Sequence, residues 1–148
     1  MREFAAARGV TIEIKRFTAT TRTAEDAAKQ IGTDVARIVK SLVFVADGRP
    51  VVALCSGAAR VDEARLAEAL GATAVRRASA GAAKSATGYA IGGVPPFAHE
   101  PECRVVADEG LLVFDVVWAA AGLPDAVFAI APRELIRLAN ASVMRVAR

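Results

Sequence analysis

The feature of this sequence that most constrains the fold is a pair of apolar, β-branched segments separated by an Asp-Gly dipeptide. Residues 38–46 (IVKSLVFVA) and 50–56 (PVVALCS) each have the composition of a strand, and Asp47-Gly48 between them is typical of a hairpin turn. Short helices and further strands are spaced irregularly around this hairpin. Such an order favours a mixed sheet or barrel with packed helices over a doubly wound parallel sheet.

Periodicity and capping signals divide the rest of the chain into short elements. Residues 10–17 alternate apolar and polar side chains and predict a strand, while Thr23 followed by Asp26 fits a capping box that opens a helix ending at Gly32. Residues 87–99 are too rich in Gly and Pro for regular structure. No repeat or linker divides the sequence, so we expect one domain over 1–148. Further helices are expected over 1–8, 62–70, 80–86 and 132–139, and further strands over 74–77, 104–107, 116–120, 126–131 and 143–146.

Composition excludes several classes of protein. With 54% hydrophobic and 24% charged residues, the chain is not disordered, and no apolar run reaches the roughly 18 residues that a membrane span needs. The N-terminal sequence MREFAAARGV lacks the apolar stretch of a signal peptide, so we expect a soluble, cytoplasmic protein without a membrane partner. Two cysteines without a CxxC pair and a single histidine argue against a disulfide scaffold and a metal site. The net charge of +3 is too small to indicate a nucleic-acid partner by itself.

Lys40 is the first candidate for a functional residue. Strict alternation places Ile38, Lys40, Leu42 and Phe44 on one face of the first hairpin strand. An ammonium group on an apolar face is costly to bury unless it is paired or lines a wet cavity. One interpretation is a lysine that projects into a pocket and holds an anionic or carbonyl group. The other is a strand-edge lysine that extends its ammonium group to solvent.

The Gly- and Pro-rich loop is the second candidate. Gly92 and Gly93 allow the backbone to approach a ligand closely, and Pro95-Pro96 stiffens the end of the loop. Free amides on such a loop can bind a carboxyl ester, a ribose or a phosphate, although a plain surface loop is an equal alternative. Since the loop is neither a GxGxxG nor a P-loop, no nucleotide cofactor is indicated. His99 has no evident partner and is expected to be a lone surface histidine.

No nucleophile, acid pair or metal set emerges from the remaining residues. Cys55 is expected to fill the core, and Cys103 has no evident activator. If the protein is an enzyme, its substrate must therefore supply part of the chemistry.

Taken in order, several segments resemble the YbaK/ProX family of aminoacyl-tRNA deacylases, which are related to the editing domain inserted in bacterial prolyl-tRNA synthetases. The resemblance implies an α/β fold of the α+β type, in which short helices surround a mixed, mostly antiparallel, barrel-like sheet. It also implies hydrolysis of the ester that links a wrong amino acid to the 3′ end of a tRNA, often tRNA(Pro). The segments that carry it, over nearly the whole chain, are IVKSLVF around Lys40, 87–89 (TGY), 92–97 (GGVPPF), 114–122 (FDVVWAAAG) and 132–136 (PRELI).

The resemblance also implies roles for individual residues. Lys40 matches the family's essential lysine, and the segment from Gly92 to Pro96 matches a GxxxP loop whose backbone faces the ester. Because an aminoacyl ester is already reactive, a water or the neighbouring ribose hydroxyl can attack it once held in place, and no cofactor is expected. The residues expected to bind substrate are Thr87, Gly92, Gly93, Val94, Pro95, Pro96, Gly122, Phe17, Ala120 and Val127.

Departures from the family pattern concern the amino acid that is removed. Members that remove cysteine carry Tyr, Ser and Asp where this chain has Phe17, Ala120 and Val127. An apolar pocket for alanine or a similarly small aliphatic residue is the resulting prediction. Discrimination is expected to be modest, because one methylene in a pocket contributes about 1–3 kcal/mol. Ala98 also stands where many members have Gly after the loop.

The expected function is that of a trans-acting aminoacyl-tRNA deacylase in translation quality control. Its expected partners are the acceptor end of a mischarged tRNA and, as a second candidate, prolyl-tRNA synthetase. Two alternatives stay open: a non-catalytic tRNA- or partner-binding module with the same fold, and a small-molecule ester hydrolase that uses the same pocket.

Overall fold

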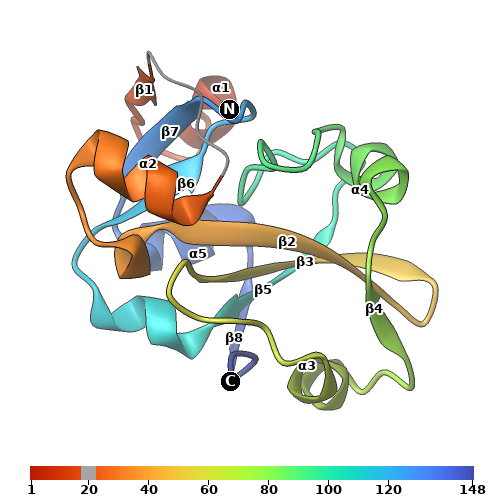
Figure 1. Cartoon of the computed structure of the whole chain (residues 1–148). Helices are drawn as coiled ribbons and strands as arrows, with labels where there is room; N and C mark the ends of the chain where they lie inside the picture. Colours follow the sequence, from red (N-terminus) through yellow and green to blue (C-terminus); the bar gives the residue numbers. More distant parts are fainter. Residues whose placement is uncertain (18–22) are drawn as a thin grey trace.

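Two open β-sheets form the framework of a computed structural model that describes residues 1–17 and 23–148 (Figure 1). Within these residues the larger sheet has the order β4-β2-β3-β5-β8 and the smaller sheet the order β1-β7-β6. The pairs β3–β5 and β5–β8 are parallel and the other pairs are antiparallel, so the predicted mixed, mostly antiparallel character is confirmed. The strands are β1 (Ile14–Arg16), β2 (Val39–Ala46), β3 (Arg49–Ser56), β4 (Val75–Arg77), β5 (Arg104–Asp108), β6 (Val117–Ala120), β7 (Ala126–Ile130) and β8 (Ser142–Met144).

The predicted hairpin lies at the centre of the larger sheet. Asp47 and Gly48 both have positive φ, 48° and 82°, and the register runs from Val39 opposite Ser56 to Ala46 opposite Arg49. On its other side, β2 pairs with β4 only over residues 44–46. In the described part of the chain no strand covers that edge over residues 39–42, and this free edge positions the candidate site.

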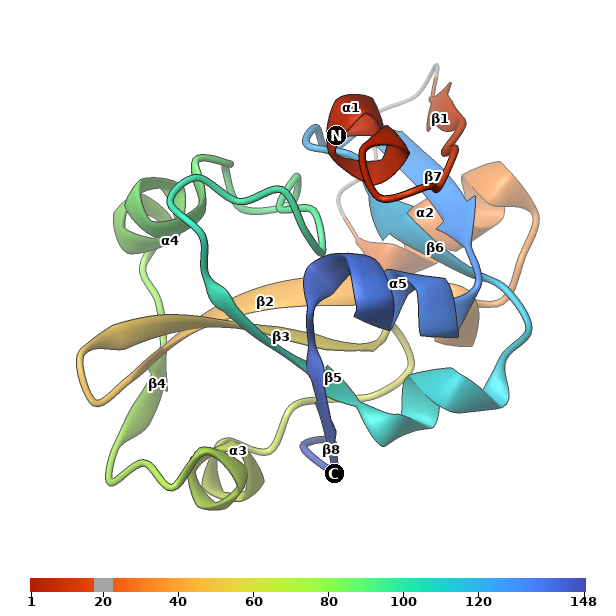
Figure 2. The ribbon, with the colours of Figure 1, turned by 180° about the vertical axis from the view of Figure 1, so that it is seen from behind.

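Short helices flank both sheets, and their ends follow the predicted capping signals. Thr23 accepts a hydrogen bond from the amide of Asp26 (3.1 Å), and Gly32 ends the same helix in the left-handed conformation. Figures 1 and 2 both show α3 and α4 on opposite sides of the β2–β3 ribbon. The helices are α1 (Arg2–Ala6), α2 (Ala24–Ile31), α3 (Glu63–Leu70), α4 (Ala80–Thr87) and α5 (Pro132–Ala139), with 3₁₀ turns at η1 (Val35–Arg37) and η2 (Glu109–Val113).

Alternation along β2 divides its side chains between two apolar clusters. Val39 and Val43 pack in one cluster with Val94 and Phe97 of the Gly- and Pro-rich segment. Phe44 and Ala46 pack on the opposite face, in a cluster that contains Leu66 of α3. The larger sheet therefore has a core on each face, one under the loop and one under α3.

Two predictions about the fold differ most from the structure. The strand expected over 10–17 is reduced to Ile14–Arg16, because Ile12 is buried in the core cluster without a strand partner and satisfies the apolar alternation in that way. The barrel-like sheet is not confirmed either. Closure would require the edges of the two sheets to pair, whereas within residues 1–17 and 23–148 a single parallel bridge, Ile38 to Trp118, joins them.

Candidate functional site

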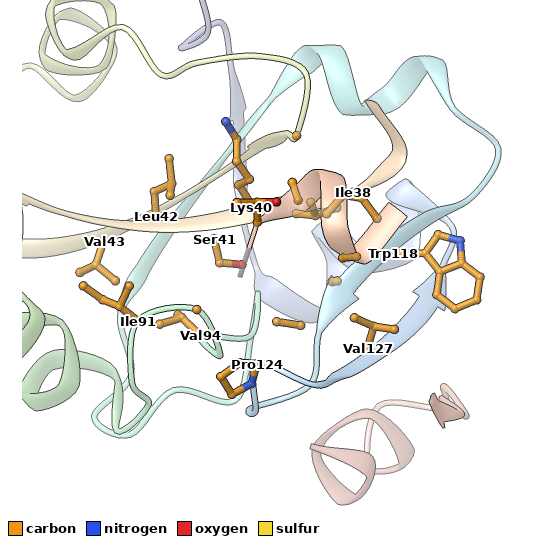
Figure 3. A pocket seen from close by; sticks show the side chains of 18 of the residues that line it. Ile38, Lys40, Ser41, Leu42, Val43, Ile91, Val94, Trp118, Pro124 and Val127 are labelled. Carbon is orange, nitrogen blue, oxygen red and sulfur yellow. The ribbon is translucent and has the colours of Figure 1, made fainter. Parts of the chain in front are cut away.

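A pocket of about 650 Å³ lies at the free edge of β2, between the two sheets (Figure 3). Its walls come from the start of α2, the segment after β3, the end of β4, the Gly-rich loop, and the smaller sheet. The lining residues fall within 23–27, 38–43, 57–60, 77–83, 91–94, 118–120 and 124–127.

Both faces of β2 contribute to this pocket. Figure 3 shows Lys40 and Leu42 pointing to one side of the strand and Ser41 and Val43 to the other, where Val94 lies. The alternation predicted for β2 is therefore present, and it places Lys40 and the Gly-rich loop on opposite faces. They meet in one pocket because the pocket extends around the free edge of the strand.

The Lys40 ammonium is half-buried and donates a hydrogen bond to the carbonyl of Ala59. That carbonyl is held in place by its own segment. Ser56 donates to the carbonyl of Ala36 (2.7 Å) and accepts from the amide of Ala58 (3.2 Å). An ammonium has three N–H donors, so two remain for a ligand. In the described residues Lys40 forms no ion pair.

Cys55, opposite Lys40 in the β2–β3 register, is fully buried, and its expected place in the core is confirmed. Burial raises the pKa of the Cys55 thiol, and the positive charge of Lys40 lowers that pKa by a smaller amount. A thiol with a raised pKa is a poor nucleophile. The Cys55 side chain therefore packs in the core beside Lys40.

The Gly-rich loop reaches the pocket through Gly92 and Val94. The Gly93 amide donates to the carbonyl of Ala90 (3.0 Å). On its other side, Gly93 packs against backbone, since a Cβ there would lie 3.0 Å from the carbonyl oxygen of Gly122. Among the described residues, the amides of Gly92 and Val94 donate to no acceptor. Both residues line the pocket, and neither amide is used by the described part of the chain.

Several residues expected in the site lie behind the pocket wall. Gly122 has a φ of 96° and lies against the Tyr89 ring, where a Cβ would be 3.0 Å from Cε1. The buried Thr87 hydroxyl donates to Ala83 (2.8 Å) and accepts from the amide of Tyr89 (3.1 Å), which fixes the start of the loop. These residues, together with Gly93, Pro95, Pro96 and Phe17, are not part of the lining.

His99 is not the surface histidine that we expected. It is 8% exposed, and its Nε2 lies 2.6 Å from the carbonyl oxygen of Pro95. Burial lowers the pKa of His99, and the hydrogen bond to Pro95 offsets part of that decrease. No sequence pattern indicates this partner, because the contact depends on how the loop folds back on itself.

Two of the three positions expected to set specificity line one end of the pocket, and the third lies behind them. Ala120 and Val127 are direct cross-strand partners in β6 and β7, and both line the pocket. Phe17 is buried behind them in the apolar cluster that contains Val127 and Ile38. The wall that Ala120 and Val127 form is apolar.

Other lining residues were not among those expected in the site. Trp118 and the first turn of α2 border the apolar end, and three charged residues besides Lys40 line the pocket: Glu25, Arg60 and Arg77. In the described part of the chain, no group of three or more His, Cys, Asp or Glu residues could hold a metal ion. No described helix has the length and apolar character needed to cross a bilayer.

Comparison with known proteins gives matches over much of the chain. The family model described as "Aminoacyl-tRNA editing domain" matches residues 18–138. "Uncharacterized protein YwhH" of Bacillus subtilis (strain 168) is 35% identical over 126 residues, covering 83% of this chain and 78% of YwhH. The "Proline--tRNA ligase" of Citrifermentans bemidjiense is 37% identical over 87 residues, covering 59% of this chain but only 15% of the ligase.

Solved structures match the whole fold. One, named "Crystal structure of a putative trans-editing enzyme for prolyl tRNA synthetase", has a TM-score of 0.93 at 37% identity and covers 99% of this chain and 94% of its own. Another, named "Crystal structure of hypothetical protein APE2540", has a TM-score of 0.91 at 33% identity, with 99% and 97% covered. Since the family model spans most of the sequence and the likeness extends through the fold, the chain belongs to the aminoacyl-tRNA editing domain family.

Proposed function

We propose that this chain is a trans-acting deacylase that hydrolyses the ester of a mischarged tRNA, with tRNA(Pro) carrying a small amino acid as the expected substrate. The observation that carries the proposal is the placement of Lys40 in one pocket with the loop donors of Gly92 and Val94. Family membership supports an aminoacyl-tRNA ester as the substrate. The likeness to a structure named for trans-editing supports tRNA(Pro).

The proposed reaction needs positioning more than a protein nucleophile. A water oxygen attacks the ester carbonyl carbon, the bond from that carbon to the ribose oxygen breaks, and a proton from the water goes to the ribose oxygen. The products are a free amino acid and a tRNA with its terminal hydroxyl restored. Because the aminoacyl ester is reactive, holding the water in attack geometry supplies much of the acceleration.

Two groups of the pocket suit the charge that develops during attack. The loop amides of Gly92 and Val94 are free to stabilise the oxyanion, as paired backbone donors do in other acyl-transfer sites. Lys40 anchors the carbonyl end by its charge through the N–H groups that Ala59 leaves unused. The substrate therefore lies across the free edge of β2 and contacts both faces of the strand.

The apolar end of the pocket suits a small aliphatic side chain. Ala120 and Val127 present methyl groups, and neither can hydrogen-bond to a hydroxyl or thiol. We propose that alanine, or a residue of similar size, is bound there. Steric exclusion of larger side chains is the basis of selection, and it gives modest ratios between neighbouring sizes.

A panel of mischarged tRNAs tests the proposed function. Wild-type protein is expected to deacylate at least one small aminoacyl-tRNA, and Lys40→Ala to lower kcat/KM by about 10²–10³, as loss of a charge-stabilising group does. Lys29→Ala, a change of an exposed lysine on α2 outside the pocket, is the matched control and should stay within about twofold of wild type. Circular dichroism and thermal unfolding check that each variant is folded.

Other results of the same panel contradict the proposal. Full activity in folded Lys40→Ala rules out the assigned role of the lysine. Hydrolysis of free amino-acid esters alone identifies a small-molecule hydrolase, and hydrolysis of no substrate leaves a binding module. The structure favours the deacylase over the binding module, because Lys40 forms no ion pair with the described residues and the pocket is open.

A further inference from the structure

Charged residues are distributed unevenly along the pocket, which follows strand β2. Arg77 lies opposite Phe44 in the β2–β4 register, at the far end of the pocket from the bridge between Ile38 and Trp118. Arg60 directly follows Ala59, whose carbonyl accepts the Lys40 hydrogen bond. The pocket thus carries arginines beside Lys40 and beyond it toward β4.

The opposite end of the pocket has a different character. Its apolar wall is formed by Trp118, Ala120 and Val127, and Glu25 lies in the first turn of α2, which packs on that wall through Ala24 and Ala27. A phosphate would be repelled by the carboxylate of Glu25 and would gain nothing from the apolar wall. Among the residues that the structure describes, an anionic ligand is therefore favoured at the β4 end of the pocket.

Both arginines are available to a ligand. Each side chain is exposed, and neither guanidinium forms an ion pair within residues 1–17 and 23–148. Arg77 rests on the Phe44 ring, with Cζ 5.6 Å from the ring centroid. Phe44 shares a face of β2 with Lys40, so Arg77 lies on the lysine's side of the sheet. The buried Cys55 thiol agrees with this placement, because the charges of both Lys40 and Arg77 lower its pKa.

The distance between Lys40 and Arg77 indicates the kind of ligand that the pocket binds. Phe44 is four residues from Lys40, which in a strand corresponds to about 13 Å. An amino-acid ester has no anionic group at such a distance from its carbonyl carbon. The 3′ end of an RNA chain has one, because phosphodiesters continue away from the terminal ribose, and arginine forks pair well with phosphate oxygens.

We propose that Arg60 and Arg77 bind backbone phosphates of the 3′-terminal nucleotides of the RNA substrate. This inference rests on the proposed function and adds an orientation to it. The RNA chain leaves the pocket past β4, the ester lies at Lys40, and the amino acid points toward Ala120 and Val127.

Two substrates separate phosphate binding from other roles of these arginines. One is an alanylated tRNA, and the other is alanyl-adenosine, an ester of the same amino acid and nucleoside without phosphate. Arg60→Gln and Arg77→Gln are each expected to lower kcat/KM for the tRNA by about tenfold or more, the effect of losing a charged hydrogen bond. Hydrolysis of alanyl-adenosine should stay within about twofold, and Arg77→Lys should recover part of the loss on tRNA.

Salt dependence gives a second readout that does not need hydrolysis. Binding of uncharged tRNA should weaken with salt, and the double variant should reduce the log–log slope by about 1.4, or roughly 0.7 for each lost contact to single-stranded RNA. The matched control is the double variant Arg133→Gln with Arg145→Gln, because both side chains are exposed and lie outside the pocket. This control should leave both the slope and the kinetics unchanged.

The outcomes that overturn the inference differ from those that overturn the deacylase. Equal losses on tRNA and alanyl-adenosine, an unchanged salt slope, or the same loss in the control each exclude phosphate binding by Arg60 and Arg77. A wild-type protein that hydrolyses neither substrate removes alanine as the bound residue, and one that hydrolyses no member of the mischarged-tRNA panel removes the proposed function. In that case the tRNA-binding slope still decides the role of the two arginines.

Discussion

Lys40 is a single lysine in an apolar strand, and its local packing leaves its charge available to a ligand. Lys40 lies between Val39 and Ser41 in a strand whose other face is core. Full burial of its ammonium group would be costly. The free edge of β2 leaves this group partly exposed to solvent, and the Ala59 carbonyl accepts a hydrogen bond from it. The lysine is therefore held in place without being neutralised by a carboxylate.

Ala98 is a residue under backbone strain at the end of the loop. Its φ is +64°, a conformation that costs a residue with a Cβ about 1–2 kcal/mol and costs glycine almost nothing. We expect Ala98→Gly to raise the free energy of unfolding by about 1 kcal/mol in urea denaturation. Ala67→Gly in the interior of α3 is the matched control and should lower it by about 1 kcal/mol. A loss of stability in Ala98→Gly equal to that of the control contradicts this account.

At the scale of elements, the Gly-rich loop is positioned by contact between two backbones. Gly93 approaches the turn between β6 and β7 so closely that a Cβ would lie 3.0 Å from the Gly122 oxygen and 3.1 Å from the Leu123 Cα. Neither of these is a flexible side-chain end that can turn aside. The position of the Gly92 and Val94 amides therefore depends on the absence of a side chain at Gly93.

A pair of glycine substitutions tests this dependence. Gly93→Ala is expected to displace the loop, to lower the free energy of unfolding by about 1–3 kcal/mol, and to reduce deacylation. Gly81→Ala is the control, because Gly81 lies within α4, has no atom near its Cβ position and should gain up to about 1 kcal/mol. Unfolding curves and tRNA deacylation rates of the two variants provide the comparison. Unchanged activity and stability in Gly93→Ala would show that the contact does not position the loop.

Elements with local signals could be predicted from the sequence. The β2–β3 hairpin follows from β-branched residues around Asp47-Gly48, and α2 follows from the Thr23 cap and Gly32. The strand prediction over residues 10–13 is wrong because alternation reports which side chains are buried, not whether a neighbouring strand pairs with them. Strand pairing depends on long-range partners that no local pattern contains.

The same distinction applies to the candidate site. Alternation correctly placed Lys40 and Leu42 on one face of β2. The pocket itself could not be predicted, because it exists where β4 stops short at residue 77 and leaves part of β2 uncovered. Arg60 and Arg77 had no signal for the same reason, since their place in the pocket is set by the pairing of distant segments.

At the scale of the whole molecule, one buried carboxylate ties the end of the chain to the larger sheet. Asp108, at the end of β5, accepts hydrogen bonds from the amides of Val146 (2.9 Å), Ala147 (3.0 Å) and Gly110 (3.0 Å). The same C-terminal segment also contacts the segment after β3, because the Arg148 amide donates a hydrogen bond to the Arg60 carbonyl (2.9 Å). Packing of the C-terminal segment and placement of the pocket are thus connected.

Removal of this carboxylate should therefore affect the whole fold. Asp108→Ala leaves three amide donors without an acceptor, and we expect the free energy of unfolding to fall by about 3 kcal/mol or more. Asp34→Ala is the control, because Asp34 is exposed and caps η1 without a side-chain hydrogen bond. Urea denaturation of both variants checks the difference. Equal stability of the two variants would remove the structural role assigned to Asp108.

The arrangement of two sheets joined at the Ile38–Trp118 bridge has a consequence for how such a pocket can diversify. Lys40 belongs to the larger sheet, whereas Ala120 and Val127 belong to the smaller one. Exchanges at positions 120 and 127 can therefore change the size and polarity of that end of the pocket without moving the lysine. Under the proposed function, selection among amino acids can evolve on one sheet while the lysine that anchors the ester stays unchanged on the other.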